Sequence, residues 1–66
     1  MNLLNIEILG LLNEQEALSA PYLQRKMKLK DKEIQEAFLW LVNCCDNVSC
    51  DKEENGRIFK VFLSSH

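Results

Sequence analysis

The sequence predicts a small α+β domain in which three helices are followed by a two-stranded β-hairpin. Apolar residues recur three and four positions apart in three segments before Asp46, which is the spacing of one helix face. After Asp46-Asn47 the spacing changes to two, the period of a strand, and Asn55-Gly56 is a strong hairpin signal. With 66 residues the chain has room for a single domain, residues 1–66.

The first helix is expected over Asn2–Asn13, where large apolar residues follow a helical spacing: Leu3, Leu4, Ile8, Leu11 and Leu12. Ile6 and Leu9 fill the positions between them, so this helix is apolar on more than one face. Such a helix is either covered on two sides by its own chain or paired with a second chain. We therefore expect a homodimer, with Leu4 and Leu11 in the protein interface.

Two further helices are expected after a polar connection over residues 13–18. Ser19 is a good N-cap, and Pro21 fits the first turn of a helix that runs from Ala20 to about Lys28. The third helix is expected from Asp31 to between Asn43 and Cys45. Its apolar face consists of five residues at helical spacing: Ile34, Ala37, Phe38, Leu41 and Cys45.

The hairpin is expected to close through a two-residue type I′ turn at Asn55-Gly56, which needs a positive φ at both positions. That turn places two oppositely charged pairs and two apolar pairs across the strands: Glu54 with Arg57, Asp51 with Lys60, Cys50 with Val61, and Val48 with Leu63. The agreement of all four pairs with one register supports the predicted hairpin.

One apolar pattern spans the second and third helices: Leu23, Met27, Leu29, Ile34, Phe38 and Leu41. The same plan extends to both sides of it: Ile8, Leu9 and Leu12 upstream, and the Val48–Leu63 hairpin downstream. Together they resemble the winged helix-turn-helix DNA-binding superfamily, in particular small bacterial, phage or plasmid regulators. Three positions depart from the family pattern: Lys28 where the turn often has Gly, Lys30 where a Ser or Thr cap is usual, and Cys45-Asp46 where Gly is common.

A basic cluster is the one feature that points to a ligand. It contains five of the eight basic residues: Arg25, Lys26, Lys28, Lys30 and Lys32. The net charge of −2 excludes a generally basic nucleic-acid binder but leaves room for a local basic patch. The resemblance implies that this edge faces the phosphate backbone. Three basic residues of the hairpin are candidates for a second contact: Lys52, Arg57 and Lys60. The alternative interpretation is a solvated polar face.

The outward face of the third helix supports two functions. Lys32, Gln35 and Asn43 carry groups that can contact base edges, whereas Glu36 would repel phosphates unless it accepts from cytosine. Leu39 and Trp40 instead indicate a protein contact, although Trp40 could also pack inside the domain. The sequence therefore predicts a small transcriptional regulator that binds duplex DNA. The alternative is a protein-interaction module, an anti-repressor or assembly adaptor, that uses the apolar surfaces of the first and third helices.

No catalytic residue, cofactor or metal is expected. Cys44, Cys45 and Cys50 form an odd set with an adjacent pair, and we interpret them as small buried hydrophobic residues of a reduced, cytoplasmic protein. Together with His66 the cysteines could form a metal site, but structural zinc sites usually have two groups of paired ligands at short spacing, and this set has one adjacent pair. No stretch approaches the roughly 18 apolar residues of a membrane span, and we expect no enzymatic activity.

Overall fold

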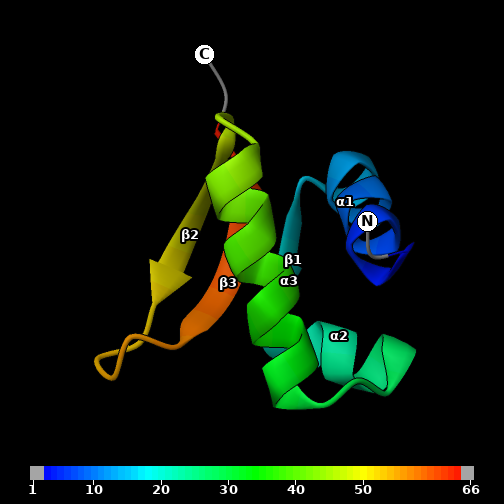
Figure 1. Cartoon of the computed structure of the whole chain (residues 1–66), viewed down its shortest axis with the longest axis vertical. Helices are drawn as coiled ribbons and strands as arrows, with labels where there is room; N and C mark the ends of the chain where they lie inside the picture. The colour runs from blue at the N-terminus through cyan, green and yellow to red at the C-terminus, as the bar shows by residue number, and fades with distance from the viewer. Residues whose placement is uncertain (1–2, 65–66) are drawn as a thin grey trace.

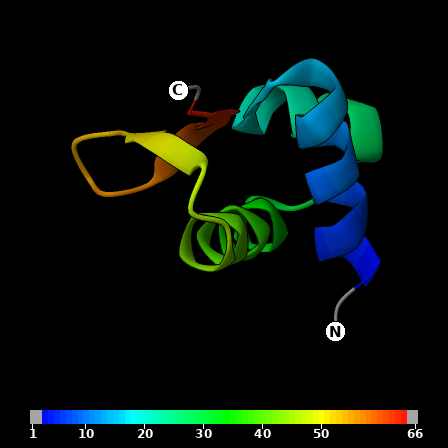
Figure 2. The ribbon, with the colours of Figure 1, turned by 90° about the horizontal axis from the view of Figure 1, so that it is seen from above.

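The structure, a computed structural model, describes residues 3–64 and has α+β architecture, with three helices and a three-stranded antiparallel sheet (Figure 1). The elements follow in the order α1 (Leu3–Gln15), β1 (Ala17–Ser19), α2 (Ala20–Met27), α3 (Asp31–Cys44), β2 (Val48–Lys52) and β3 (Ile58–Leu63). The strand order is β1-β3-β2. α1 and α2 contact β1 and β3, α3 contacts β2 and β3, and the hairpin loop extends away from the helices (Figure 2).

The predicted helices are present, and their ends have local causes. The Ser19 hydroxyl oxygen accepts a hydrogen bond from the Tyr22 N–H at 3.3 Å, so Ser19 is the N-cap of α2 as predicted. Lys28 takes a left-handed conformation with φ of 55° and ends α2 without the glycine that is usual there. α1 continues to Gln15, past the expected end at Asn13, and the expected start at Asn2 lies outside the described residues.

α3 begins at Asp31 as predicted, although Lys30 before it cannot cap a helix with its side chain. The carboxylate of Glu33 accepts a hydrogen bond from the Lys30 N–H at 3.0 Å. An acid in the first turn also interacts favourably with the helix dipole. Glu33 therefore stabilises this helix end by accepting from the N–H of the N-cap residue.

The core lies between the helices and the inner face of the sheet. It consists of twelve buried apolar residues: Ile8, Leu12, Leu18, Ala20, Leu23, Ile34, Ala37, Phe38, Leu41, Val48, Ile58 and Val61. Within residues 3–64 no polar or charged residue is buried. Each fully buried Leu, Ile or Phe side chain contributes about 1.5–3 kcal/mol of hydrophobic free energy, so this cluster is the main source of stability.

The sheet has a third strand, which corrects the predicted two-stranded hairpin. β1 overlaps the end of the segment that we expected to be a polar connection, and it pairs with β3 so that Leu18 faces Val61. Glu16, with φ of 70°, turns the chain out of α1, and its carbonyl accepts a hydrogen bond from the Leu63 N–H at 2.9 Å. A three-residue strand with one buried side chain is too short to show a period of two, which is why the sequence pattern missed it.

The hairpin turn also differs from the prediction. The Gly56 N–H donates to the Glu53 carbonyl at 2.9 Å and the Glu53 N–H donates to the Arg57 carbonyl at 2.8 Å, which defines a three-residue loop. Gly56 has φ of 90°, whereas Asn55 does not have a positive φ, so the turn is not type I′. The Asn55 side-chain oxygen accepts from the Arg57 N–H at 2.9 Å. Glu53 rather than Glu54 therefore faces Arg57.

The predicted register holds in the body of the hairpin, where Asp51 faces Lys60. The pairs Cys50–Val61 and Val48–Leu63 are also as predicted. Lys52 faces Ile58, so Phe59 is one extra residue on β3, a β-bulge. The bulge compensates for the longer loop, and it leaves Phe59 41% exposed next to buried Ile58.

Candidate nucleic-acid interface

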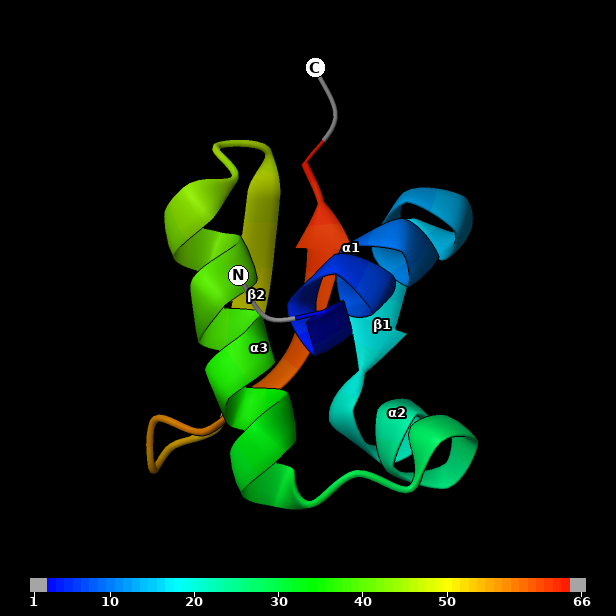
Figure 3. The ribbon, with the colours of Figure 1, turned by 45° about the vertical axis from the view of Figure 1, so that its right-hand side comes forward.

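Five basic residues follow one another closely in the chain at one end of the molecule, and we call them the basic edge: Arg25, Lys26, Lys28, Lys30 and Lys32. They follow the end of α2, the connection and the first turn of α3, and this connection runs along the end of the molecule away from the C-terminal end of β3 (Figure 3). All five residues are exposed. In the part of the chain that the structure describes, none of them forms an ion pair. Their charges are therefore free to interact with an anionic partner.

Tyr22 links α2, which carries part of the basic edge, to α1. Its hydroxyl oxygen accepts a hydrogen bond from the Gln15 side-chain amide at 2.8 Å, which ties α2 to the end of α1. The Lys26 ammonium lies 6.0 Å from the centre of the Tyr22 ring. At an exposed site such a cation–π contact contributes about 0.5–1 kcal/mol, so it orients Lys26 without neutralising its charge.

Arg57, predicted to contact DNA from the hairpin, is paired with carboxylates. Its Nε donates to both Asp31 oxygens at 3.0 and 3.1 Å, its Nη2 also bonds to Asp31, and its Nη1 lies 3.4 Å from Glu53. These hydrogen bonds lower the pKa of the Asp31 carboxyl, and the bond with Asp31 raises the pKa of Arg57. Arg57 thus joins the hairpin to the first turn of α3, and its charge is matched within the domain.

Gln35, predicted to contact a base edge, is bound to the backbone of β3. Its Nε2 donates to the Ile58 carbonyl at 2.7 Å, and its Oε1 accepts from the Ile58 N–H at 2.8 Å. Both ends of the amide are occupied, so Gln35 does not present a free edge to a base. Its two hydrogen bonds to the Ile58 backbone instead hold the start of β3 against α3.

The rest of the outward face of α3 carries mixed chemistry. Its exposed residues are Lys32, Glu33, Glu36, Leu39, Asn43 and Cys44. Leu39 is 53% exposed, whereas Trp40 is half-buried and packs against the core. The structure therefore keeps Lys32 and Asn43 as free candidates for base contact, places Leu39 beside them, and removes most of Trp40 from the surface.

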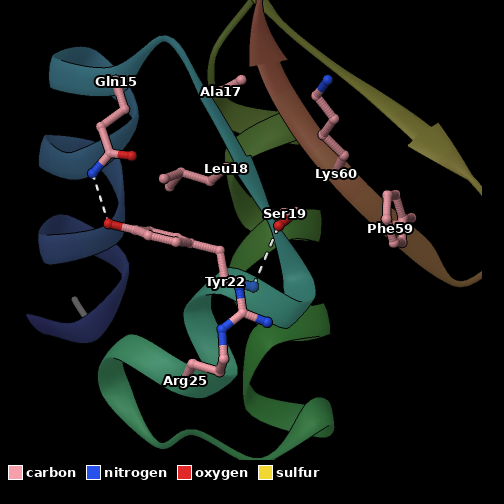
Figure 4. A pocket seen from close by; sticks show the side chains of 8 residues that line it. All are labelled: Gln15, Ala17, Leu18, Ser19, Tyr22, Arg25, Phe59 and Lys60. Carbon is pink, nitrogen blue, oxygen red and sulfur yellow. Dashed lines mark hydrogen bonds between the residues drawn. The ribbon is translucent and has the colours of Figure 1, made fainter.

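A hollow of about 470 Å³ lies between α2 and the sheet, next to the basic edge. Arg25 and Lys60 stand at separate ends of it, Ser19 and Tyr22 lie between them, and Phe59 lies to one side (Figure 4). None of the described residues that line it is acidic. The bulge on β3 puts Phe59 there, and sequence patterns did not reveal this because they predicted no bulge.

The predicted interface residues of α1 are less accessible than expected. Leu4 and Leu11 are half-buried and pack against the core. The most exposed apolar residues of α1 are instead Leu3 and Ile6, which are 76% and 44% exposed. An apolar surface is thus present on α1, but its most exposed residues are Leu3 and Ile6 rather than the predicted Leu4 and Leu11.

The cysteines are all free thiols. Cys44 is exposed, which corrects the expectation that it is buried, and Cys45 and Cys50 are half-buried. Across residues 3–64 no group of three His, Cys, Asp or Glu side chains is placed to hold a metal ion, and His66 lies outside this range.

Comparisons of the chain with protein-family models, with characterised proteins and with solved structures gave no match. None of the helices in the described range is long and apolar enough to cross a membrane.

Proposed function

We propose that this chain is a small winged-helix domain that binds duplex DNA through the basic edge and acts as a transcriptional regulator. The observation that carries the proposal is the set of five exposed basic residues without an ion pair on one edge. Phosphate binding needs local positive charge of this kind, whatever the net charge of the chain is. The element order and the strand order β1-β3-β2 support the winged-helix arrangement.

In this proposal α3 enters the major groove while the basic edge follows the phosphates. Lys32 and Asn43 contact base edges, because both are exposed on α3 and carry hydrogen-bonding groups. Gln35 and Arg57 leave the set of predicted DNA contacts and become the residues that fix the hairpin against α3. Lys60 remains as a contact from β3.

The proposal is tested by fluorescence anisotropy with random-sequence duplex DNA at about 50 mM salt, where electrostatic binding is strong. Replacing Lys28 and Lys30 by Gln removes two charges from the basic edge, and affinity should fall at least tenfold for every sequence. Asn13→Asp with Asn47→Asp is the matched control, because it changes the net charge equally at two exposed positions outside the edge. Equal losses in both double variants, or no binding by the wild type, would contradict the proposal.

One observation favours a second function, a protein-interaction module. Leu39 is 53% exposed between the acidic residue Glu36 and Asn43 on α3, and an exposed leucine adds nothing to phosphate binding. The variants Leu39→Ala and Lys28→Gln/Lys30→Gln distinguish the two functions in cells. If regulation is lost with Leu39→Ala and kept with the lysine variant, the interaction module replaces the DNA-binding regulator.

A further inference from the structure

One stripe of exposed residues on α1 contains both a protruding side chain, Leu3, and a position without a side chain, Gly10. Leu3, Glu7, Gly10 and Glu14 follow each other at intervals of four, three and four residues, which places them above one another on a helix. This stripe lies opposite the buried residues Ile8 and Leu12. Leu3 is 76% exposed, so its side chain stands out from the stripe.

Gly10 makes a depression in this stripe. It lies inside α1, it is exposed, and a Cβ built on it would meet no atom within 4 Å. A glycine inside a helix destabilises the helix relative to alanine. Neither the conformation nor the packing of this domain therefore requires glycine here, but a second backbone or a large side chain that approaches α1 closely would require it.

A groove of about 370 Å³ opens beside Gly10 between α1 and α2. Leu11 and Met27 supply apolar surface in it, and both pack against the core. Its charged residues have both signs, with Glu7 and Glu14 on α1 and Lys26 on α2. In a two-fold arrangement that places the N-terminal part of one α1 over the groove of the other copy, Lys26 of each copy comes near Glu7 of the other.

We propose that this groove receives Leu3 of a second copy, so that two chains form an antiparallel dimer through α1. Leu3 and Gly10 are seven residues apart, which is about 10.5 Å along a helix. A two-fold axis that passes α1 between residues 6 and 7 brings each Leu3 over the other copy's Gly10. One patch then serves both partners, as a two-fold interface requires. This inference does not depend on DNA binding.

The proposed dimer is small, and it dissociates on dilution. One helix and one groove bury less than the roughly 800 Å² per partner of a standard interface, so we expect dimers at about 500 µM and monomers at about 5 µM protein. Ile6, 44% exposed and next to the axis, would meet its own copy. Glu7 is also near the axis, where Lys26 at the rim of the same groove offsets the repulsion between the two glutamates.

The experiment is sedimentation equilibrium of the full chain from about 5 µM to 1 mM, combined with thermal melts at the lowest concentration. Gly10→Ala should weaken dimerisation at least tenfold because the added methyl fills the seat of Leu3. The same variant should melt at a higher temperature than the wild type at low concentration, because alanine favours the helix and its Cβ meets nothing. These opposite effects separate a lost contact from a damaged fold.

Two more variants complete the test. Leu3→Gln should abolish the dimer and leave the melting temperature of the monomer unchanged, because Leu3 is 76% exposed. Leu39→Gln, an equally polar change on exposed α3, should leave the dimer intact. Each of three results would overturn the proposal. The wild type could stay monomeric at 1 mM, the dimer could survive both Gly10→Ala and Leu3→Gln, or Leu39→Gln could be the only variant that disrupts it.

Discussion

Gln35 links two segments that are 23 residues apart, because its amide exchanges two hydrogen bonds with Ile58. A glutamine on the polar side of a helix looks free when only the sequence is read, since helical periodicity reports faces and not long-range partners. The same holds for Arg57, whose pairing with Asp31 joins residues 26 positions apart. Both predicted DNA contacts therefore have a structural use that local patterns do not reveal.

Replacing Gln35 by Ala should lower the free energy of unfolding by about 1–2 kcal/mol, because the Ile58 N–H and carbonyl lose partners that are partly buried. Urea denaturation followed by circular dichroism measures this change. Asn43→Ala is the control, since Asn43 is exposed and should change stability little. If Gln35 reads bases instead, Gln35→Ala will keep wild-type stability and lose selectivity among duplexes.

The Asp31–Arg57 pair should make stability depend on pH. Because the folded state lowers the pKa of Asp31, the contribution of this carboxylate is present above its unfolded pKa and is lost as pH falls through its folded pKa. Wild type should therefore be more stable than Asp31→Asn near neutral pH, and the difference should disappear between about pH 5 and pH 2. Melting temperatures across this range measure the effect. In an Arg57→Gln background, Asp31→Asn should show a smaller pH dependence, because only the interaction of the Asp31 carboxylate with the helix dipole remains.

Among the helices and strands, prediction from the sequence succeeded where an apolar pattern extends over many residues or where one residue has a specific local role. All three helices and the Ser19 cap were predicted because apolar periodicity and a capping hydroxyl are local properties. The pairing of Asp51 with Lys60 was also correct, since alternation of side chains determines the register. β1 and the bulge at Phe59 were not predicted, because both depend on pairing with a distant strand.

The hairpin loop depends on the backbone of Gly56, which has φ of 90°. Gly56→Val should cost about 1–3 kcal/mol, because a β-branched residue is strained in this region. Asn55→Ala should cost less, because Asn55 has an ordinary φ and loses only its acceptor for the Arg57 N–H. Thermal melts of both variants provide the comparison. If Asn55→Ala is the more damaging variant, the turn has the two-residue form after all.

At the scale of the whole molecule, charge is segregated in a way that composition hides. The net charge is −2, yet five cations line one edge, while the hairpin arginine is neutralised by Asp31 and Glu53. Composition could therefore exclude a generally basic protein but could not say which cations are free. From the sequence we could predict only the part of the candidate site whose charged residues lie close together in the chain.

The salt dependence of DNA binding reports how many basic side chains of the protein contact phosphates. Each phosphate contact lowers the slope of log affinity against log salt by about 0.9. The four residues of the basic edge other than Lys32, together with Lys60, therefore allow a slope as steep as about −4.5. Lys30→Gln should flatten the slope by about 0.9, because an exposed lysine without an ion pair displaces about one counterion from the DNA when it neutralises a phosphate. Anisotropy titrations from about 50 to 200 mM salt measure it.

The matched variant for this measurement is Arg57→Gln with Asp31→Asn, which removes one charge of each sign. Since the pair is neutralised internally, the slope should stay at the wild-type value, although the hairpin is less firmly held. The titrations are done well below the melting temperature of the variant, so that only folded protein contributes. A slope that flattens equally in both variants would mean that Arg57 leaves Asp31 to bind phosphate, and the hairpin would then belong to the DNA-binding surface.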